Sequence, residues 1–174
     1  LPGPIPFRDV RLGVMICEDM WTGEVAECLE ESGAELLIVP NGSPYDIVNI
    51  ERRMNQAVAR VTETELPIIY VNQVGGQDEL VLDGASFVLD AERNLRAQLP
   101  AWTEAVVTTT WQRTADGWAC EMGEVAPEQC RFAMIYQAMV TGLADYVGKN
   151  GFPGVLIGMS GGIDSALSAA VAAD

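Results

Sequence analysis

The 174-residue sequence contains no histidine, and its only lysine is Lys149. Histidine is the side chain most often used as a general base near neutral pH. Its absence excludes every Ser-His or Cys-His catalytic arrangement built within this chain. Any nucleophile in the sequence therefore needs a different kind of base.

Basic residues and long apolar runs are also scarce. Lys and Arg number 10 against 25 Asp and Glu, and the resulting net charge of −15 would repel a nucleic acid or an anionic membrane surface. No apolar run approaches the roughly 18 residues of a membrane span, and no secretory leader opens the chain. We therefore expect a soluble, cytoplasmic protein that acts on small molecules, with no nucleic acid or membrane partner.

The cysteines follow no disulfide or metal-binding pattern. The four cysteines are Cys17, Cys28, Cys120 and Cys130, and no two of them have CxxC spacing. The hydrophobic content of 49% is enough for a buried core, so the fold need not depend on disulfides. Reduced thiols are expected. Cys17 differs from the others because an apolar run ends there and a helical pattern follows, whereas the other three are expected to be structural.

Apolar runs alternate with helical patterns in the first part of the chain. Strands are predicted at 12–16, 36–40 and 68–71, and helices at 24–32 and 50–65. Short segments rich in Val, Phe and Thr predict further strands at 84–90, 94–99 and 104–111. The pattern is typical of an α/β fold.

A change in composition predicts a domain boundary. The sequence becomes polar and irregular between Gln112 and Pro127, so we expect one domain over 1–112, a linker over 113–126 and a second domain over 127–174. A helix is predicted from Pro127 to about Lys149, where apolar residues at helical spacing form one stripe: Phe132, Ile135, Met139, Leu143 and Tyr146.

The second domain begins with a candidate phosphate site. An apolar run from Gly154 to Met159 predicts a buried strand, and Ser160 to Ser165 form a turn before a helix. Gly161 and Gly162 can bring backbone N–H groups close to an anion, and the helix N-terminus favours negative charge there. Asp164 beside phosphates would need a divalent cation, so we assign it as a Mg²⁺ ligand.

The Ser-Gly-Gly-Ile-Asp-Ser sequence resembles the loop of the ATP pyrophosphatase superfamily. That resemblance implies ATP binding by the loop residues, while an ordinary strand-to-helix turn capped by Asp164 is the alternative. The loop residues implied to bind ATP are Gly158, Met159, Ser160, Gly161, Gly162, Ile163, Asp164 and Ser165. The superfamily includes NAD, GMP and asparagine synthetases, so this loop alone leaves the substrate open.

Cys17 is the candidate nucleophile of the first domain. At the junction of a strand and a helix its thiol can be exposed, and the following N–H groups can lower its pKa and stabilise an oxyanion. Acyl transfer from an amide requires both effects. A buried, purely structural thiol is the alternative.

Three segments resemble known families. The run from Ile16 to Trp21, followed by Asn41 to Tyr45, resembles the carbon-nitrogen hydrolase (nitrilase) family. The segment from Gln73 to Gly84 is similar to the glutaminase domain of glutamine-dependent NAD synthetases. The implied fold is the C-terminal part of a nitrilase-like α-β-β-α sandwich, followed by the first strand and helix of a Rossmann-like nucleotide-binding domain.

The resemblance implies a ligase reaction. Cys17 would attack the carboxamide of glutamine, with Glu18 beside the substrate and Ser43 at its amino-acid end. The ammonia would pass to nicotinic acid adenine dinucleotide that has been activated with ATP and Mg²⁺, and the product would be NAD. Relatives form large homo-oligomers, so we expect one here.

The sequence departs from the family at two points. Nitrilase-type cysteines are partnered by a lysine and a glutamate upstream, whereas Lys149 lies far downstream of Cys17. Asn49 stands where relatives commonly carry a basic residue for the glutamine carboxylate. We expect Asn49 to contact glutamine there, with Arg52 or Arg53 as a possible substitute.

We expect a piece of a longer polypeptide that is inactive alone, because it lacks a suitable lysine or histidine base. An amidase with an appended ATP-binding domain acting on another acid, or a non-catalytic binding module, remain alternatives.

Overall fold

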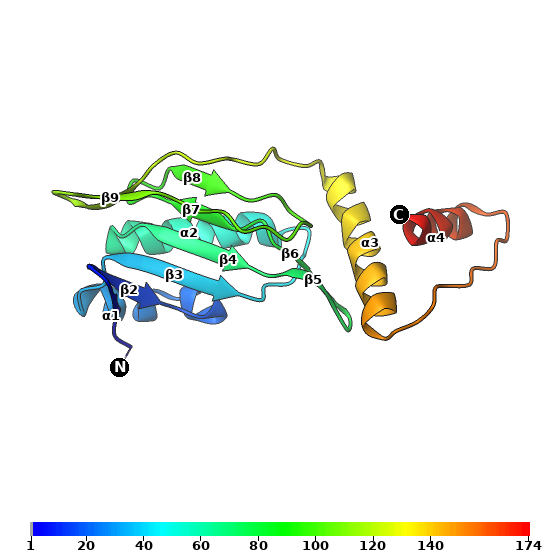
Figure 1. Cartoon of the computed structure of the whole chain (residues 1–174), viewed down its shortest axis with the longest axis horizontal. Helices are drawn as coiled ribbons and strands as arrows, with labels where there is room; N and C mark the ends of the chain where they lie inside the picture. Colours follow the sequence, from blue (N-terminus) through cyan, green and yellow to red (C-terminus); the bar gives the residue numbers. More distant parts are fainter. Residues whose placement is uncertain (1) are drawn as a thin grey trace.

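The computed structural model describes residues 2–174, with the side chains of Asn49 and Ile50 excepted. Figure 1 shows a twisted sheet with helices α1 and α2 on one face, a hairpin that reaches helix α3, and helix α4 at the far end of the molecule. No helix of the described residues is long and apolar enough to cross a bilayer.

The main sheet has six strands in the order β1-β2-β3-β4-β7-β8. Strands β2, β3 and β4 are parallel, and the other neighbours pair antiparallel. The strands are β1 (Ile5–Phe7), β2 (Val10–Val14), β3 (Leu36–Asn41), β4 (Ile68–Asn72), β7 (Phe87–Leu89) and β8 (Leu95–Gln98). Because parallel neighbours need crossovers, α1 (Gly23–Glu31) and α2 (Asn49–Thr64) connect them. The carboxyl ends of three strands therefore meet at one edge.

The core lies between the sheet and these two helices. Alternate residues of β3 and β4 face the helices, which is why Leu37, Val39 and Ile68 are fully buried. Tyr70 stacks on Phe87 with ring centroids 4.8 Å apart. Helix α1 contributes Ala26 and Leu29, and helix α2 contributes Ala57 and Val61.

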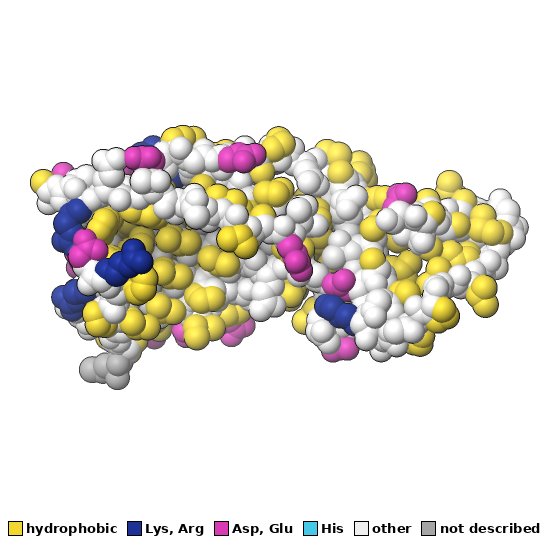
Figure 2. All heavy atoms as spheres, viewed as in Figure 1, with side chains coloured by type: hydrophobic (Ala, Val, Ile, Leu, Met, Phe, Trp, Pro, Cys, Tyr) yellow, Lys and Arg dark blue, Asp and Glu magenta, His cyan; other side chains and the backbone are white. Residues whose placement is uncertain are grey.

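The opposite face of the sheet is apolar and largely uncovered. Figure 2 shows hydrophobic side chains gathered over this face, which includes the exposed Val71 and the half-buried Ile38 and Ile69. The described residues thus form one helical layer and one sheet layer of the expected α-β-β-α sandwich. An apolar sheet face of this kind normally packs against a second sheet.

A hairpin covers one end of this face, in a region predicted to be irregular. Strands β9 (Trp111–Thr114) and β10 (Gly117–Cys120) pair antiparallel, and Cys120 packs with Val88 and Ala97. The expected irregular structure from 112 to 120 was therefore wrong. The strand predicted over 104–111 was also wrong, since 104–110 carries no strand and is mostly exposed.

A second hairpin, which the sequence did not reveal, connects the sheet to the C-terminal helices. It consists of β5 (Val74–Gln77) and β6 (Leu80–Asp83), and helix α3 (Arg131–Lys149) packs on it. The apolar stripe predicted for α3 is not its main contact face. Phe132 is 80% exposed and Tyr146 is 54% exposed, whereas the face bearing Gly142 and Asp145 meets the hairpin.

The buried strand predicted from Gly154 to Met159 was also wrong. This segment has no regular secondary structure and is exposed, and it pairs with no strand of the described residues. A strand is stabilised by hydrogen bonds to neighbours, and no neighbour lies beside it here. The predicted helix beyond it does form, as α4 (Ile163–Ala173).

Candidate functional site

Cys17 lies at a sharp turn between β2 and a short 3-10 helix, η1 (Cys17–Met20). Its φ of 53° is in the left-handed region, which costs a non-glycine residue about 1–2 kcal/mol. The Asp19 carboxylate accepts a hydrogen bond from the N–H of Ile16 at 2.8 Å, and Arg60 donates to the carbonyl of Met20 at 3.1 Å. The turn is thus held at both ends in a strained conformation.

The thiol lines an open groove rather than the core. A cavity of about 260 Å³ is formed at the carboxyl ends of β2, β3 and β4, and its lining includes Cys17, Asn41, Gly42 and Asn72. Cys17 itself is half-buried. A side chain with a carboxamide can reach a thiol in this position.

Ser43 follows β3 beside this groove, and a buried arginine fixes its loop. Arg53 donates to the Ser43 hydroxyl at 3.0 Å and to the carbonyls of Ser43 and Pro44 at 2.9 and 2.8 Å. Its remaining terminal nitrogen pairs with both carboxylate oxygens of Asp83, at 2.8 and 3.0 Å. Asn72 adds two bonds to the Ser43 backbone. Arg53 is therefore engaged in the scaffold and has no group left for a substrate.

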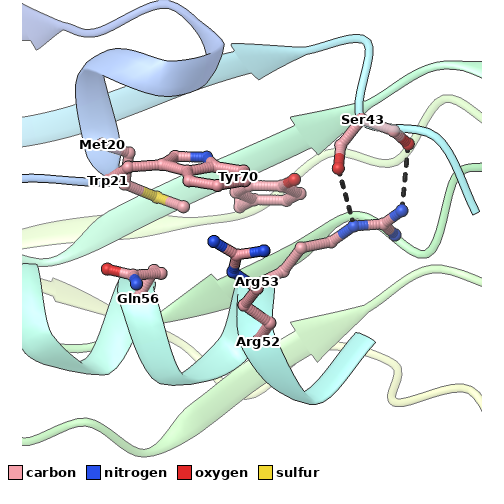
Figure 3. Close-up of a pocket in the computed structure, with 7 residues that line it drawn as sticks. All are labelled: Met20, Trp21, Ser43, Arg52, Arg53, Gln56 and Tyr70. Atoms are coloured by element: carbon pink, nitrogen blue, oxygen red, sulfur yellow. Dashed lines mark hydrogen bonds between the residues drawn. The ribbon is translucent and has the colours of Figure 1, made fainter. Parts of the chain in front are cut away.

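Arg52, the neighbouring residue, is placed quite differently. Figure 3 shows its guanidinium beneath the ring of Trp21. The Arg52 Cζ lies 4.1 Å from the centroid of that ring. The space enclosed by Trp21, Arg52, Gln56 and Tyr70 is about 10 Å³, which holds about one water molecule. Arg52 is exposed at the rim of this cluster, so its charge remains accessible.

Tyr70 is a buried member of the same cluster. Burial raises the pKa of its hydroxyl, and this outweighs the lowering by Arg53 and by a hydrogen bond with Ser43. A negative charge on Cys17 would raise this pKa further. Tyr70 therefore stays protonated beside the site.

The other predicted residues are divided between the two ends of the molecule. Glu18 is exposed on η1, directly after Cys17. Asn49 begins α2, but its side chain lies outside the described residues. Lys149 ends α3, where its ammonium donates to the carbonyl of Gly76 and pairs with Asp145 at 3.3 Å. Lys149 is therefore occupied far along the chain from Cys17.

The Ser160–Ser165 loop is the second candidate site. Gly161 has a φ of 84°, and Gly162 is the N-cap residue of α4. The Ser160 and Ser165 hydroxyls lie 3.0 Å apart, and Ser165 donates to the carbonyl of Gly162 at 3.0 Å. Loop and helix N-terminus fit a phosphate group, although on this chain they lie on an exposed surface.

The fit to Mg²⁺ rests on Asp164 in the first turn of α4. No cluster of three or more metal-binding side chains occurs within residues 2–174 as described. Asp164 can therefore supply one carboxylate ligand, and phosphate oxygens or water would complete the shell.

Cys17 lines the groove at the carboxyl ends of β2, β3 and β4, and Ser43 and Arg52 line the small space around Trp21 and Tyr70. The Ser160–Ser165 loop leads into α4, beyond α3 (Figure 1). Tyr70, Asn72 and the pairing of Asp83 with Arg53 were not foreseen. A polar residue at the end of a buried strand was the available signal for Asn72, but nothing local in the sequence pairs Arg53 with Asp83.

Comparison with known proteins agrees with this two-part organisation. The carbon-nitrogen hydrolase family model matches residues 3–119, and the NAD synthase family model matches residues 135–174. A glutamine-dependent NAD(+) synthetase of Rhodobacter capsulatus is 47% identical over 98% of this chain. The chain spans 31% of that relative's length.

Solved structures show the same likeness. A glutamine-dependent NAD⁺ synthetase of Acinetobacter baumannii, in complex with ADP, aligns with a TM-score of 0.89 and 37% identity over 97% of this chain and 32% of its own. A carbon-nitrogen hydrolase of Helicobacter pylori aligns with a TM-score of 0.53 and 26% identity, covering 59% of this chain and 41% of its own. Our chain belongs to the carbon-nitrogen hydrolase family, with the start of an NAD synthase domain at its C-terminal end.

Proposed function

We propose that this chain carries the nucleophile of a glutaminase and the phosphate loop of a synthetase, and that the protein containing it makes NAD from nicotinic acid adenine dinucleotide, glutamine and ATP. The observation that carries the proposal is Cys17 at a strained turn, open to a groove at the ends of β2, β3 and β4. The NAD synthase match over residues 135–174 supports the second half.

Cys17 would act as a covalent nucleophile. Its thiolate sulfur attacks the carboxamide carbon of glutamine, a C–S bond forms, and the C–N bond then breaks as the nitrogen gains a proton and leaves as ammonia. Water hydrolyses the thioester to glutamate and frees the thiol. Neither histidine nor Lys149 can serve as its base, because the chain has no histidine and Lys149 is bound to Gly76 and Asp145. We propose that the lysine and glutamate partners lie in a part of the protein outside this chain.

The ammonia would react at the second site. There ATP transfers its adenylyl group to the carboxylate of nicotinic acid adenine dinucleotide and releases pyrophosphate. Ammonia then displaces AMP to form the amide of NAD. The N–H groups at the start of α4 would hold the phosphates, and Mg²⁺ on Asp164 would neutralise their charge.

The test is an assay of the full-length protein with glutamine, Mg·ATP and nicotinic acid adenine dinucleotide. NAD and glutamate should form together, and NAD formation should stop without ATP. Glutamine hydrolysis with no NAD under any of these conditions would favour an amidase that acts on another acid.

Arg52 is our candidate for binding the α-carboxylate of glutamine. Arg53 is fully engaged, whereas Arg52 is exposed beside Ser43 and held on Trp21. Arg52→Met should raise the KM for glutamine about 10-fold, since a hydrogen bond to a charged group contributes about 1.5–3 kcal/mol. Ammonia-dependent NAD formation should not change.

A matched control is Arg8→Met, which removes another arginine that lies over an aromatic ring, Phe7, at the other end of β2. Glutamine lacking its α-carboxylate (4-aminobutanamide) serves as the second probe. If Arg52→Met reduced its hydrolysis as much as that of glutamine, Arg52 would not be the carboxylate ligand.

Asp164→Asn should reduce Mg·ATP use by at least about 10-fold, because the metal would lose a charged ligand. Hydrolysis of glutamine should be spared. Steady-state rates at varied Mg·ATP measure the first effect, and glutamate release measures the second. Asp174→Asn, at the other end of α4, is the control, and an equal loss of both activities in Asp164→Asn would mean a structural role.

A further inference from the structure

Helix α3 binds both backbone polar groups of one residue in the β5–β6 hairpin. The Asp145 carboxylate accepts a hydrogen bond from the N–H of Gly76, and the Lys149 ammonium donates to its carbonyl. Asp145 and Lys149 also pair with each other at 3.3 Å, one helical turn apart. Gly76 of β5 is therefore held by two side chains of α3, the helix that precedes the phosphate loop.

Glycine allows the close approach between the two elements. A Cβ added at Gly76 would lie 3.2 Å from the Cα of Gly142 and 3.2 Å from the Cβ of Asp145. A Cβ added at Gly142 would lie 3.1 Å from a methyl group of Val81. Helix and hairpin thus approach closely at Gly76 and Gly142, and a side chain at either position would require its neighbours to shift by a few tenths of an ångström.

The same hairpin holds the loop that carries Ser43. The N–H of Tyr45 donates to the carbonyl of Val81 on β6 at 2.7 Å. Asp83, at the end of β6, binds Arg53, which in turn binds the hydroxyl and carbonyl of Ser43. The position of β6 therefore sets the position of the Ser43 loop.

Trp102 provides a second connection to α3. Its backbone N–H donates to the carbonyl of Asp83 at 2.9 Å, and its indole N–H contacts the sulfur of Met134 on α3 at 3.2 Å. Tyr45 packs edge-on against its ring, with centroids 5.1 Å apart. Two separate sets of contacts thus link α3 to the Ser43 loop.

We propose that Asp145 is a positioning residue for the glutamine site: through Gly76 and the β5–β6 hairpin, α3 sets the Ser43 loop. The expected effect on glutamine kinetics rests on the proposed function. The structural connection from Asp145 to the Ser43 loop does not depend on that function.

The test compares Asp145→Ala with Glu79→Ala in the full-length protein. Glu79 is an exposed carboxylate at the tip of the same hairpin, so its removal controls for lost charge. Asp145→Ala should reduce kcat/KM for glutamine about 5- to 10-fold, mainly through KM, and leave ammonia-dependent NAD formation unchanged. Unchanged glutamine kinetics, or an equal loss with both nitrogen donors, would overturn the proposal.

Hydrogen exchange gives a readout that does not depend on activity. Backbone amides of residues 42–48 should exchange faster in Asp145→Ala than in Glu79→Ala, because their anchor on β6 loosens. Unaltered exchange there would refute the link itself. A wild-type protein that hydrolyses no glutamine, with the exchange effect present, would instead refute the proposed function.

A second pair of variants tests the proposal even if Asp145→Ala fails to fold. Gly142→Ala adds a methyl group against Val81, whereas Gly148→Ala adds one to the same helix where nothing lies within 4 Å. Gly142→Ala should increase the KM for glutamine and the exchange of 42–48, and Gly148→Ala should change neither. The same behaviour in both variants would contradict the proposal.

Discussion

Replacing Cys17 with alanine in the full-length protein should reduce glutamine-dependent NAD formation by about 1000-fold or more, because the covalent route to ammonia is lost. NAD formation from added ammonium salt should continue, since the phosphate loop lies on a separate element beyond α3. Steady-state rates with each nitrogen donor measure the two effects.

Cys28→Ala is the matched control for this substitution. Cys28 is a half-buried thiol on α1 that contacts the carbonyl of Pro2, away from the groove. It should leave both rates unchanged. Glutamine-dependent activity that survived in Cys17→Ala would show that another group is the nucleophile.

Arg53→Met should destabilise the carbon-nitrogen hydrolase part of the chain by about 3–5 kcal/mol, the usual cost of leaving one charge of a buried pair alone. Asp83 is fully buried and Arg53 is 7% exposed, so neither group can regain water without opening the fold. The loop at Ser43 and Pro44 would also lose its side-chain support. Hydrogen exchange of the core amides in β3 and α2 reports the free energy of opening.

The adjacent Arg52→Met is a closely matched control for stability. It removes an identical side chain one residue away, but from an exposed position, and should cost under about 1 kcal/mol. The two substitutions should therefore have different effects: Arg53→Met should lower stability, and Arg52→Met should raise the KM for glutamine. Equal destabilisation by both substitutions would mean that the pair with Asp83 is not the main support of the loop.

The strands and helices from β2 to β4 were predictable because local pattern and burial agree there. Leu36 to Pro40 is a continuous apolar run, as expected of a parallel strand between two neighbours, and α2 carries its apolar residues at helical spacing. The segment from Gly154 to Met159 has the same apolar character, yet no strand forms. Strand formation depends on partners distant in sequence, which a local pattern does not contain.

Neither hairpin was predicted from the sequence, for two different reasons. Ala115 and Asp116 form the turn of β9–β10, and Gly117, the first residue of β10, has a φ of 127°, which favours glycine. The polar composition around them indicated a linker and concealed this signal. In β5–β6 the adjacent Gly75 and Gly76 lower the strand propensity of the segment. In the structure, their lack of side chains allows α3 to pack closely on the hairpin.

The candidate site was predictable only in part, for a related reason. The junction of strand and helix at Cys17 is a local feature, so its exposure could be inferred from the sequence. The choice between Arg52 and Arg53 could not, because it depends on Asp83, which comes from a hairpin 30 residues further along the chain. Adjacent helical positions face different directions, and only the tertiary contacts show which one turns inward.

The most direct test follows the amide nitrogen of glutamine. The full-length protein is supplied with glutamine carrying an isotopic label on its amide, together with Mg·ATP, nicotinic acid adenine dinucleotide and unlabelled ammonium, and the NAD is analysed by mass spectrometry. If the Cys17 site and the Ser160–Ser165 loop work together in one ligase, the label fraction in NAD will exceed that of the ammonium pool. A label fraction equal to that of the pool would mean that ammonia escapes to solvent and that the two sites do not cooperate.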